Sequence, residues 1–207
     1  RIFSLQHRSP LPVYANAAGQ AAHFILDKMR IDGRLQRSSL DGVPSGEGYL
    51  DDYAFLIAGL IDLYEATGEI DWLQQAIALN QVLDSHFANP AGGYYLTADD
   101  HEGLIVRQQP AFDSAEPSGN SAQVMNLLRL HEFTTDDAYR VRAERSFSAF
   151  AGGLASNPTA LGEMLRALRW SLSKPKQILF VAKTRAEAQQ LASAIKASYV
   201  PQRIIAV

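Results

Sequence analysis

Two stretches of this 207-residue chain repeat one helical pattern at a separation of 67 residues. Leu60 aligns with Leu127 and Leu63 with Leu130. The match continues without a gap through Glu65 and Glu132, Thr67 and Thr134, Trp72 and Tyr139, and Ala76 and Ala143. Repeated two-helix units bury their apolar faces only against neighbouring units. The repeat therefore predicts either an open solenoid or a closed ring of helical hairpins.

The strongest helix signal opens the first of these hairpins, in residues 48–68. Asp51 and Asp52 favour an N-cap, a broad apolar stripe follows them, and Gly68 predicts the end of the helix. After a short link, Asp71 is predicted to cap a second helix. Because the link is so short, the two helices are expected to lie antiparallel.

The first 50 residues predict one more helix of the same kind. Residues 1–14 contain Pro10 and Pro12 and are expected to form an extended arm. A slide of 57 residues aligns the amphipathic helix at 15–29 with the second helix of the first hairpin, so its own hairpin partner is missing. A loop rich in Gly and Ser is expected at 38–48.

Later segments alternate between β and α patterns. Residues 92–109 predict a small β-hairpin, and a polar loop at 110–120 leads into a helix at 121–132. Thr135 is expected to cap the next helix, and Asn157 and Pro158 the one after it. The fold class expected is therefore mainly α: a partial α/α toroid over 15–174, with a β-hairpin insertion and a βαβ-like appendage at 175–207.

Several motifs, in order along the chain, carry a family resemblance. They are Gly-Tyr-Leu-Asp-Asp-Tyr-Ala-Phe-Leu-Ile, Leu-Ile-Asp-Leu-Tyr-Glu-Ala-Thr-Gly, Gly-Gly-Tyr-Tyr-Leu-Thr, Val-Arg-Gln-Gln-Pro and Asp-x-Ala-Glu-Pro-Ser-Gly-Asn-Ser. From about residue 15 to 207 the chain resembles the C-terminal half of spermatogenesis-associated protein 20-like proteins.

The resemblance implies a six-hairpin α/α toroid preceded by a thioredoxin-like domain. That toroid is similar to those of N-acylglucosamine 2-epimerases and six-hairpin glycosidases. By the same resemblance, the thioredoxin-like domain and the first half of the toroid are expected to be missing from this chain. The family supplies no settled reaction.

Composition and residue spacing argue against nucleic acid, membranes, metals and cofactors as partners. A net charge of −3 with scattered Lys and Arg disfavours nucleic acid, and the longest apolar run is too short to span a membrane. There is no cysteine, and the five histidines lack metal-ligand spacing, so no metal or cofactor is expected. A cytoplasmic location is the default expectation. The epimerase comparison is weakened because no histidine pair can be assigned as its acid and base.

Two clusters of polar residues are candidates for a sugar site. One is the acidic start of the helix at 48–68, and the other is the loop that enters the helix at 121–132. Aromatic rings beside them would stack on sugar faces. We expect the catalytic residues to be Asp52, Glu116 and Asp113. We expect the substrate-binding residues to be Asp51, Tyr53, Tyr95, Arg107, Ser118 and Asn120.

Each of these residues also has a structural interpretation. One of Asp51 and Asp52 would be a helix cap, Ser118 and Asn120 would cap the next helix, and Arg107 would pair with Asp113. Two functions therefore stay open: a pocket for a sugar or sugar derivative, or a non-catalytic scaffold for the thioredoxin-like domain.

Overall fold

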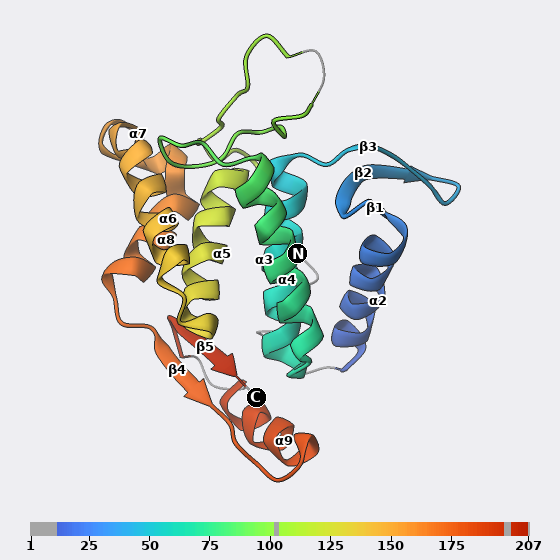
Figure 1. Cartoon of the computed structure of the whole chain (residues 1–207). Helices are drawn as coiled ribbons and strands as arrows, with labels where there is room; N and C mark the ends of the chain where they lie inside the picture. Colours follow the sequence, from blue (N-terminus) through green and yellow to red (C-terminus); the bar gives the residue numbers. More distant parts are fainter. Residues whose placement is uncertain (1–11, 102–103, 197–199, 207) are drawn as a thin grey trace.

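The computed structural model describes residues 12–101, 104–196 and 200–206, which are mainly helical (Figure 1). The helices are α2 (Pro12–Lys28), α3 (Leu50–Thr67), α4 (Ile70–His86), α5 (Gly119–Thr134), α6 (Asp137–Ala149), α7 (Ala151–Ser156), the 3-10 helix η1 (Pro158–Leu161), α8 (Gly162–Leu172) and α9 (Arg185–Lys196). The predicted helical class is confirmed.

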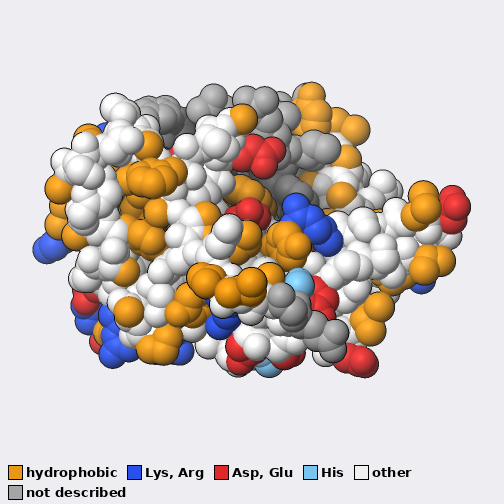
Figure 2. Space-filling model, turned by 90° about the horizontal axis from the view of Figure 1, so that it is seen from above, with side chains coloured by type: hydrophobic (Ala, Val, Ile, Leu, Met, Phe, Trp, Pro, Cys, Tyr) orange, Lys and Arg blue, Asp and Glu red, His pale blue; other side chains and the backbone are white. Residues whose placement is uncertain are grey.

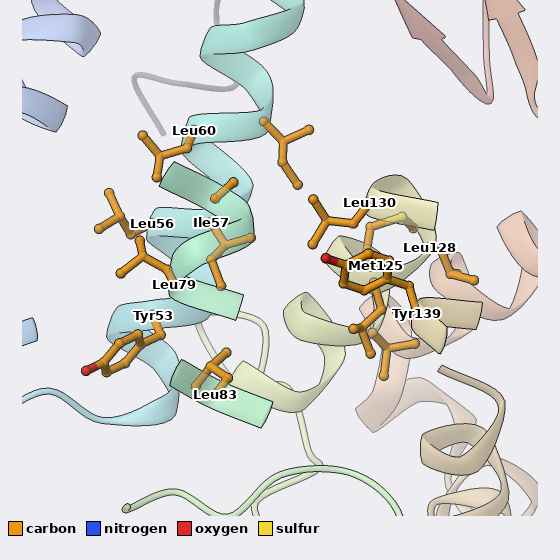
Figure 3. Packing of buried hydrophobic residues seen from close by; sticks show 14 of the residues in the cluster. Tyr53, Leu56, Ile57, Leu60, Leu79, Leu83, Met125, Leu128, Leu130 and Tyr139 are labelled. Atoms are coloured by element: carbon orange, nitrogen blue, oxygen red, sulfur yellow. The ribbon is translucent and has the colours of Figure 1, made fainter. Parts of the chain in front are cut away.

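The main helices form two layers. Helix α3 packs against α5, and α5 packs against α8, while α4 and α6 cover α3 and α5 from outside. Apolar side chains from α3, α4 and α5 meet between the layers, among them Ile57, Leu79 and Leu130 (Figure 3). Helices α3 and α5 are buried on more than one side because they lie in the inner layer. The predicted hairpins α3–α4 and α5–α6 are confirmed.

The two hairpin links repeat each other atom by atom. Thr67 Oγ1 donates to the Leu63 carbonyl at 2.8 Å, and Thr134 Oγ1 donates to the Leu130 carbonyl at 2.8 Å. Each threonine hydroxyl also accepts the backbone N–H two residues later, at 3.2 Å in both links. The next residues, Gly68 and Thr135, both end their helices in the left-handed conformation. The 67-residue repeat is therefore structural.

Three of the predicted N-caps were wrong in detail, whereas Asn157 is the N-cap of η1 and Pro158 its first residue, as predicted. Tyr49 is the N-cap of α3, and Asp52, at the third helical position, accepts the Tyr49 backbone N–H at 2.8 Å. Glu69 rather than Asp71 is the N-cap of α4. Thr135 ends α5, and Asp136 caps α6 instead. Each start lies one to three residues earlier or later than capping preference alone suggested.

Three short antiparallel strands occupy residues 30–47, which include most of the loop that was expected at 38–48. They are β1 (Arg30–Ile31), β2 (Arg34–Leu40) and β3 (Val43–Glu47), paired in the order β1-β2-β3. Each hairpin turns at an Asp-Gly pair, Asp32-Gly33 and Asp41-Gly42, with positive φ at all four residues. Such pairs fit the type I′ turn, whose twist matches that of the flanking strands. The prediction of a plain loop was wrong.

The β-hairpin predicted at 92–109 does not form in the described part of that segment. An isolated bridge between Ala88 and Tyr94 is the β-pairing found there. Side chains bond the backbone in place of a ladder: the Gln109 amide donates to the Gly92 carbonyl at 2.6 Å, for example. The segment is a long loop above the helices (Figure 1).

The two ends of the chain differ in how well the predictions fit. Helix α2 starts at Pro12, so residues 12–14 of the predicted arm are helical, and residues 1–11 lie outside the described part. At the other end β4 (Lys176–Leu179) and β5 (Arg203–Ala206) pair in parallel, joined through α9, which confirms the βαβ-like appendage. Strand β5 contacts α3 and α5 and buries Ile204 and Ile205.

Candidate functional site

The starts of the three inner helices meet at one end of the molecule. Asp51, in the first turn of α3, lies against Gly119, the first residue of α5. The Asp113 carboxylate accepts the backbone N–H of Ser118, which precedes α5, and that of Glu163 in the first turn of α8. We call this end the loop face. Figure 2 shows it from above, with acidic and basic side chains among apolar ones near its middle.

Asp51 has the most perturbed environment of the candidate residues. Its Oδ1 atom is buried beside Gly119 and lacks a well-formed hydrogen bond with any described residue. Burial raises the pKa of the Asp51 carboxyl above its ordinary value, and the charges of Asp52 and Glu116 raise it further. The Gly119 N–H and the Arg37 guanidinium oppose this rise in pKa. Burial therefore favours the protonated form of the Asp51 carboxyl.

Asp52 has well-defined partners for its carboxylate, unlike Asp51, and its side chain is partly exposed. Its Oδ2 atom accepts the Tyr49 N–H at 2.8 Å and lies 3.4 Å from Arg37 Nη1, with 31% of its side chain exposed. Arg37 comes from β2, and its guanidinium lies 4.3 Å above the Tyr49 ring. Arg37 escaped the sequence-based prediction because strand β2 was not predicted. The Asp41-Gly42 turn signal could have revealed it.

Glu116 is exposed in the loop that leads into α5. Its charge acts on Asp51, so the structure brings Asp51, Asp52 and Glu116 into one electrostatic neighbourhood. These three predicted residues, together with Arg37, form what we call the acidic cluster.

Asp113 and Ser118 have their polar atoms engaged by the backbone. Asp113 Oδ1 accepts the Ser118 N–H at 2.9 Å, and Oδ2 accepts the Glu163 N–H at 2.8 Å. Ser118 is the N-cap of α5, accepting the Ser121 N–H at 3.1 Å. These contacts tie the loop to the starts of α5 and α8. They give both residues the structural role that the sequence left open.

Arg107 and Tyr95 stack on each other at the base of the long loop. The guanidinium lies 4.1 Å from the centre of the Tyr95 ring. Arg107 also donates to the backbone carbonyls of Thr97 and His86, the latter at 2.8 Å. The sequence predicted an ion pair between Arg107 and Asp113. Among the described contacts, Arg107 bonds these carbonyl oxygens instead. Arg107 fastens the loop to the end of α4.

Tyr53 and Asn120 lie in the core. The Tyr53 hydroxyl accepts the Leu35 backbone N–H at 2.8 Å, which fixes β2 to α3. Asn120 accepts the Tyr94 N–H at 2.8 Å and donates to the carbonyls of Tyr94 and Pro110 at 2.9 and 2.7 Å. Since neither side chain faces solvent, neither is placed to touch a ligand as the structure stands.

Two hollows of the described structure lie away from the loop face. They adjoin each other between α2 and the α3–α4 link, share His23, Glu69 and Trp72, and measure about 290 and 470 Å³. Asp51, Asp52 and Glu116 line neither of them. In the acidic cluster, Asp52 is partly exposed and Glu116 is exposed at the loop face. None of the described helices is both long and apolar enough to cross a membrane.

Comparison with curated proteins places the chain in a family. It is 35% identical to spermatogenesis-associated protein 20 of mouse over 184 residues, 84% of this chain and 23% of that protein. It is 35% identical to the human protein over 204 residues, 92% of this chain and 26% of that one. The chain corresponds to one portion of a spermatogenesis-associated protein 20-like protein. It spans about a quarter of the length of these relatives, and no family model matches it.

Solved structures with the same fold are sugar enzymes. The chain superposes on cellobiose 2-epimerase from Spirochaeta thermophila with a TM-score of 0.54 and 20% identity, covering 72% of this chain and 42% of the enzyme. It superposes on a family GH76 α-mannanase from Bacteroides thetaiotaomicron with a TM-score of 0.62 and 14% identity, covering 94% and 53%. At these identities the likeness shows the fold, which is that of part of an α/α toroid.

Proposed function

We propose that this portion of the spermatogenesis-associated protein 20-like protein supplies one side of a sugar-binding site, centred on the acidic cluster at the loop face. The half-buried Asp51 carboxyl carries the proposal. A carboxyl whose pKa is raised by burial, with further carboxyl groups beside it, is an arrangement by which glycosidases provide a proton donor and a second acidic group.

The roles within the cluster follow from the contacts. Asp51 is the proton donor because burial favours its neutral form. Asp52 is the second acidic group, since it is fixed by the Tyr49 N–H and by Arg37. Glu116, exposed on the loop, is the group that adjusts to a ligand. This changes the sequence-based pairing of Asp52 with Glu116, and Asp113 becomes a positioning residue.

Cellobiose and an α-mannan oligosaccharide are the ligands to test, because the two structural neighbours are named for acting on these sugars. Isothermal titration would use both the chain and its longer parent protein. Saturable binding that Asp51→Asn and Glu116→Gln each weaken at least tenfold supports the site. The control is Asp71→Asn, an exposed acid on the outer helix α4, which should bind like the unchanged protein.

A scaffold role is the second candidate. It is favoured because Asp113, Ser118, Arg107 and Asn120 are fully used within the fold, and because the loop face exposes the apolar side chains of Ile105, Val106 and Phe112. The occupant of that surface would be the remainder of the parent protein, including the thioredoxin-like domain that the family resemblance implies. Absence of sugar binding by the parent protein would favour this role.

A further inference from the structure

A histidine and two aspartates meet beside the long loop, apart from the acidic cluster. They are His86, the last residue of α4, and Asp99 and Asp100 in the loop. Each offers one ligand atom, and these atoms lie within 4.8 Å of one another. His86 Nδ1 and Asp99 Oδ1 are 2.9 Å apart. This contact is a hydrogen bond between the two side chains. Two ligands of a tetrahedral ion, each bonded at about 2.1 Å, would be about 3.4 Å apart, so an ion replaces the hydrogen bond after a small separation of the two side chains.

The backbone holds this trio together independently of its side chains. The Asp99 N–H donates to the His86 carbonyl at 2.9 Å, and Arg107 donates to the same carbonyl at 2.8 Å. The loop is therefore fastened to the end of α4 before any ion binds. The three side chains are 35%, 54% and 59% exposed in chain order, so an ion and its waters have direct access.

The donor set fits a particular class of cation. One imidazole with two carboxylates suits Zn²⁺ and its first-row neighbours better than Mg²⁺ or Ca²⁺, which favour oxygen ligands. The two carboxylates neutralise a divalent charge. Arg34 Nη2 bonds Asp100 Oδ1 at 2.8 Å and is the competing cation. Because a carboxylate has two oxygens, Asp100 has one for the ion and one for Arg34.

We propose that His86, Asp99 and Asp100 bind a first-row divalent cation of the Zn²⁺ type, with water completing its coordination. The bound ion links the end of α4 to the long loop and, through Arg34, to β2. This site stands whether or not the loop face binds sugar.

The test is isothermal titration of Zn²⁺ into the chain, produced without a histidine tag and stripped with a chelator. We expect saturable uptake of one ion per chain. His86→Gln and Asp99→Asn should each weaken it at least tenfold, whereas Arg34→Met should leave it unchanged or tighten it. Because the His86 and Asp99 side chains are partly or largely exposed, both ligand variants should keep the far-ultraviolet circular dichroism spectrum of the unchanged protein. If one variant misfolds, the other still tests the site.

His131→Gln is the matched control. His131 also lies in the last turn of a helix, but its ring contacts the Asp136 backbone carbonyl at 3.0 Å rather than a carboxylate. This variant should bind Zn²⁺ like the unchanged protein. Equal affinity of the His86→Gln and unchanged proteins would overturn the proposal, and so would a lack of saturable uptake.

Discussion

Gly119 lies so close to Asp51 that a larger residue in its place would force neighbouring atoms to move. A Cβ atom on Gly119 would come within 2.2 Å of Asp51 Oδ1 and 2.8 Å of Leu50 Cγ. This contact joins the first turns of two neighbouring inner helices. It also buries the Asp51 oxygen, so the packing between helices and the electrostatics of the candidate site have one cause.

Replacing Gly119 with alanine should therefore destabilise the protein. The added methyl must displace the Asp51 carboxylate and the Leu50 side chain, and overpacking of this kind costs about 1 to 3 kcal/mol. Urea unfolding followed by circular dichroism would measure the loss. Gly152→Ala in α7 is the control, because nothing lies within 4 Å of its added Cβ. That change should be neutral or stabilising by up to about 1 kcal/mol.

The Asp51 carboxyl should make stability depend on pH in a defined direction. Its pKa in the folded state is raised above 3.8. Between 3.8 and that raised pKa the folded protein holds more protons than the unfolded chain, so the free energy of unfolding falls as pH rises. An amide in place of this carboxyl has no such proton to lose. Asp51→Asn should thus gain stability relative to the unchanged protein as pH rises through this window, and hold the gain at neutral pH.

Urea midpoints of both proteins at several pH values would measure that difference. A stability difference that is the same below pH 3.8 and at neutral pH would show that Asp51 ionises in the folded state as it does in the unfolded chain. The proton-donor role proposed for it would then lose its basis.

Asn120 should be needed for stability rather than for ligand contact. Asn120→Ala leaves the buried Tyr94 N–H and the Pro110 carbonyl without this partner, which should cost about 2 to 4 kcal/mol. Thermal or urea unfolding would detect it. The exposed Asn157→Ala should change stability by less than about 1 kcal/mol. An equally small effect of both substitutions would contradict the structural role of Asn120.

The helical architecture was predictable because its signals are local. Apolar periodicity and the Gly68 stop predicted α3, and the 67-residue repeat predicted the second hairpin. The same register places Thr135 where Gly68 stands, as a helix end. Intrinsic capping preference pointed the other way, and the register of the repeat was the better guide.

The site was harder to predict because polar side chains serve either the fold or a ligand. Nothing in the sequence tells that Asp113 spans the starts of α5 and α8, or that Arg107 bonds carbonyls instead of Asp113. Those partners come from distant segments. Asp51 differs from Asp52 for the same reason: adjacent in sequence, one lies against α5 and the other faces β2.

A buried ion cluster between α3 and α5 offers a last test of the hairpin packing. Arg129 Nη2 lies 2.7 Å from Asp62 and 3.5 Å from Glu65, whose side chain is fully buried. Burial disfavours the Arg129 charge, but the two carboxylates outweigh it and raise the pKa of Arg129. Arg129→Met should cost about 3 to 5 kcal/mol because it leaves buried carboxylates without their cation.

Adding Glu65→Leu to Arg129→Met should recover part of this loss, since the double variant removes the more deeply buried of the two carboxylates. The matched control is Arg140→Met on α6, whose ion pairs with Asp137 and Glu144 are exposed. It should change the free energy of unfolding by about 1 kcal/mol at most. Urea unfolding of the Arg129→Met variant, the Glu65→Leu variant and the variant that carries both changes would give a double-mutant cycle. Strictly additive losses for Arg129 and Glu65 would mean that the two inner helices are not coupled through this pair.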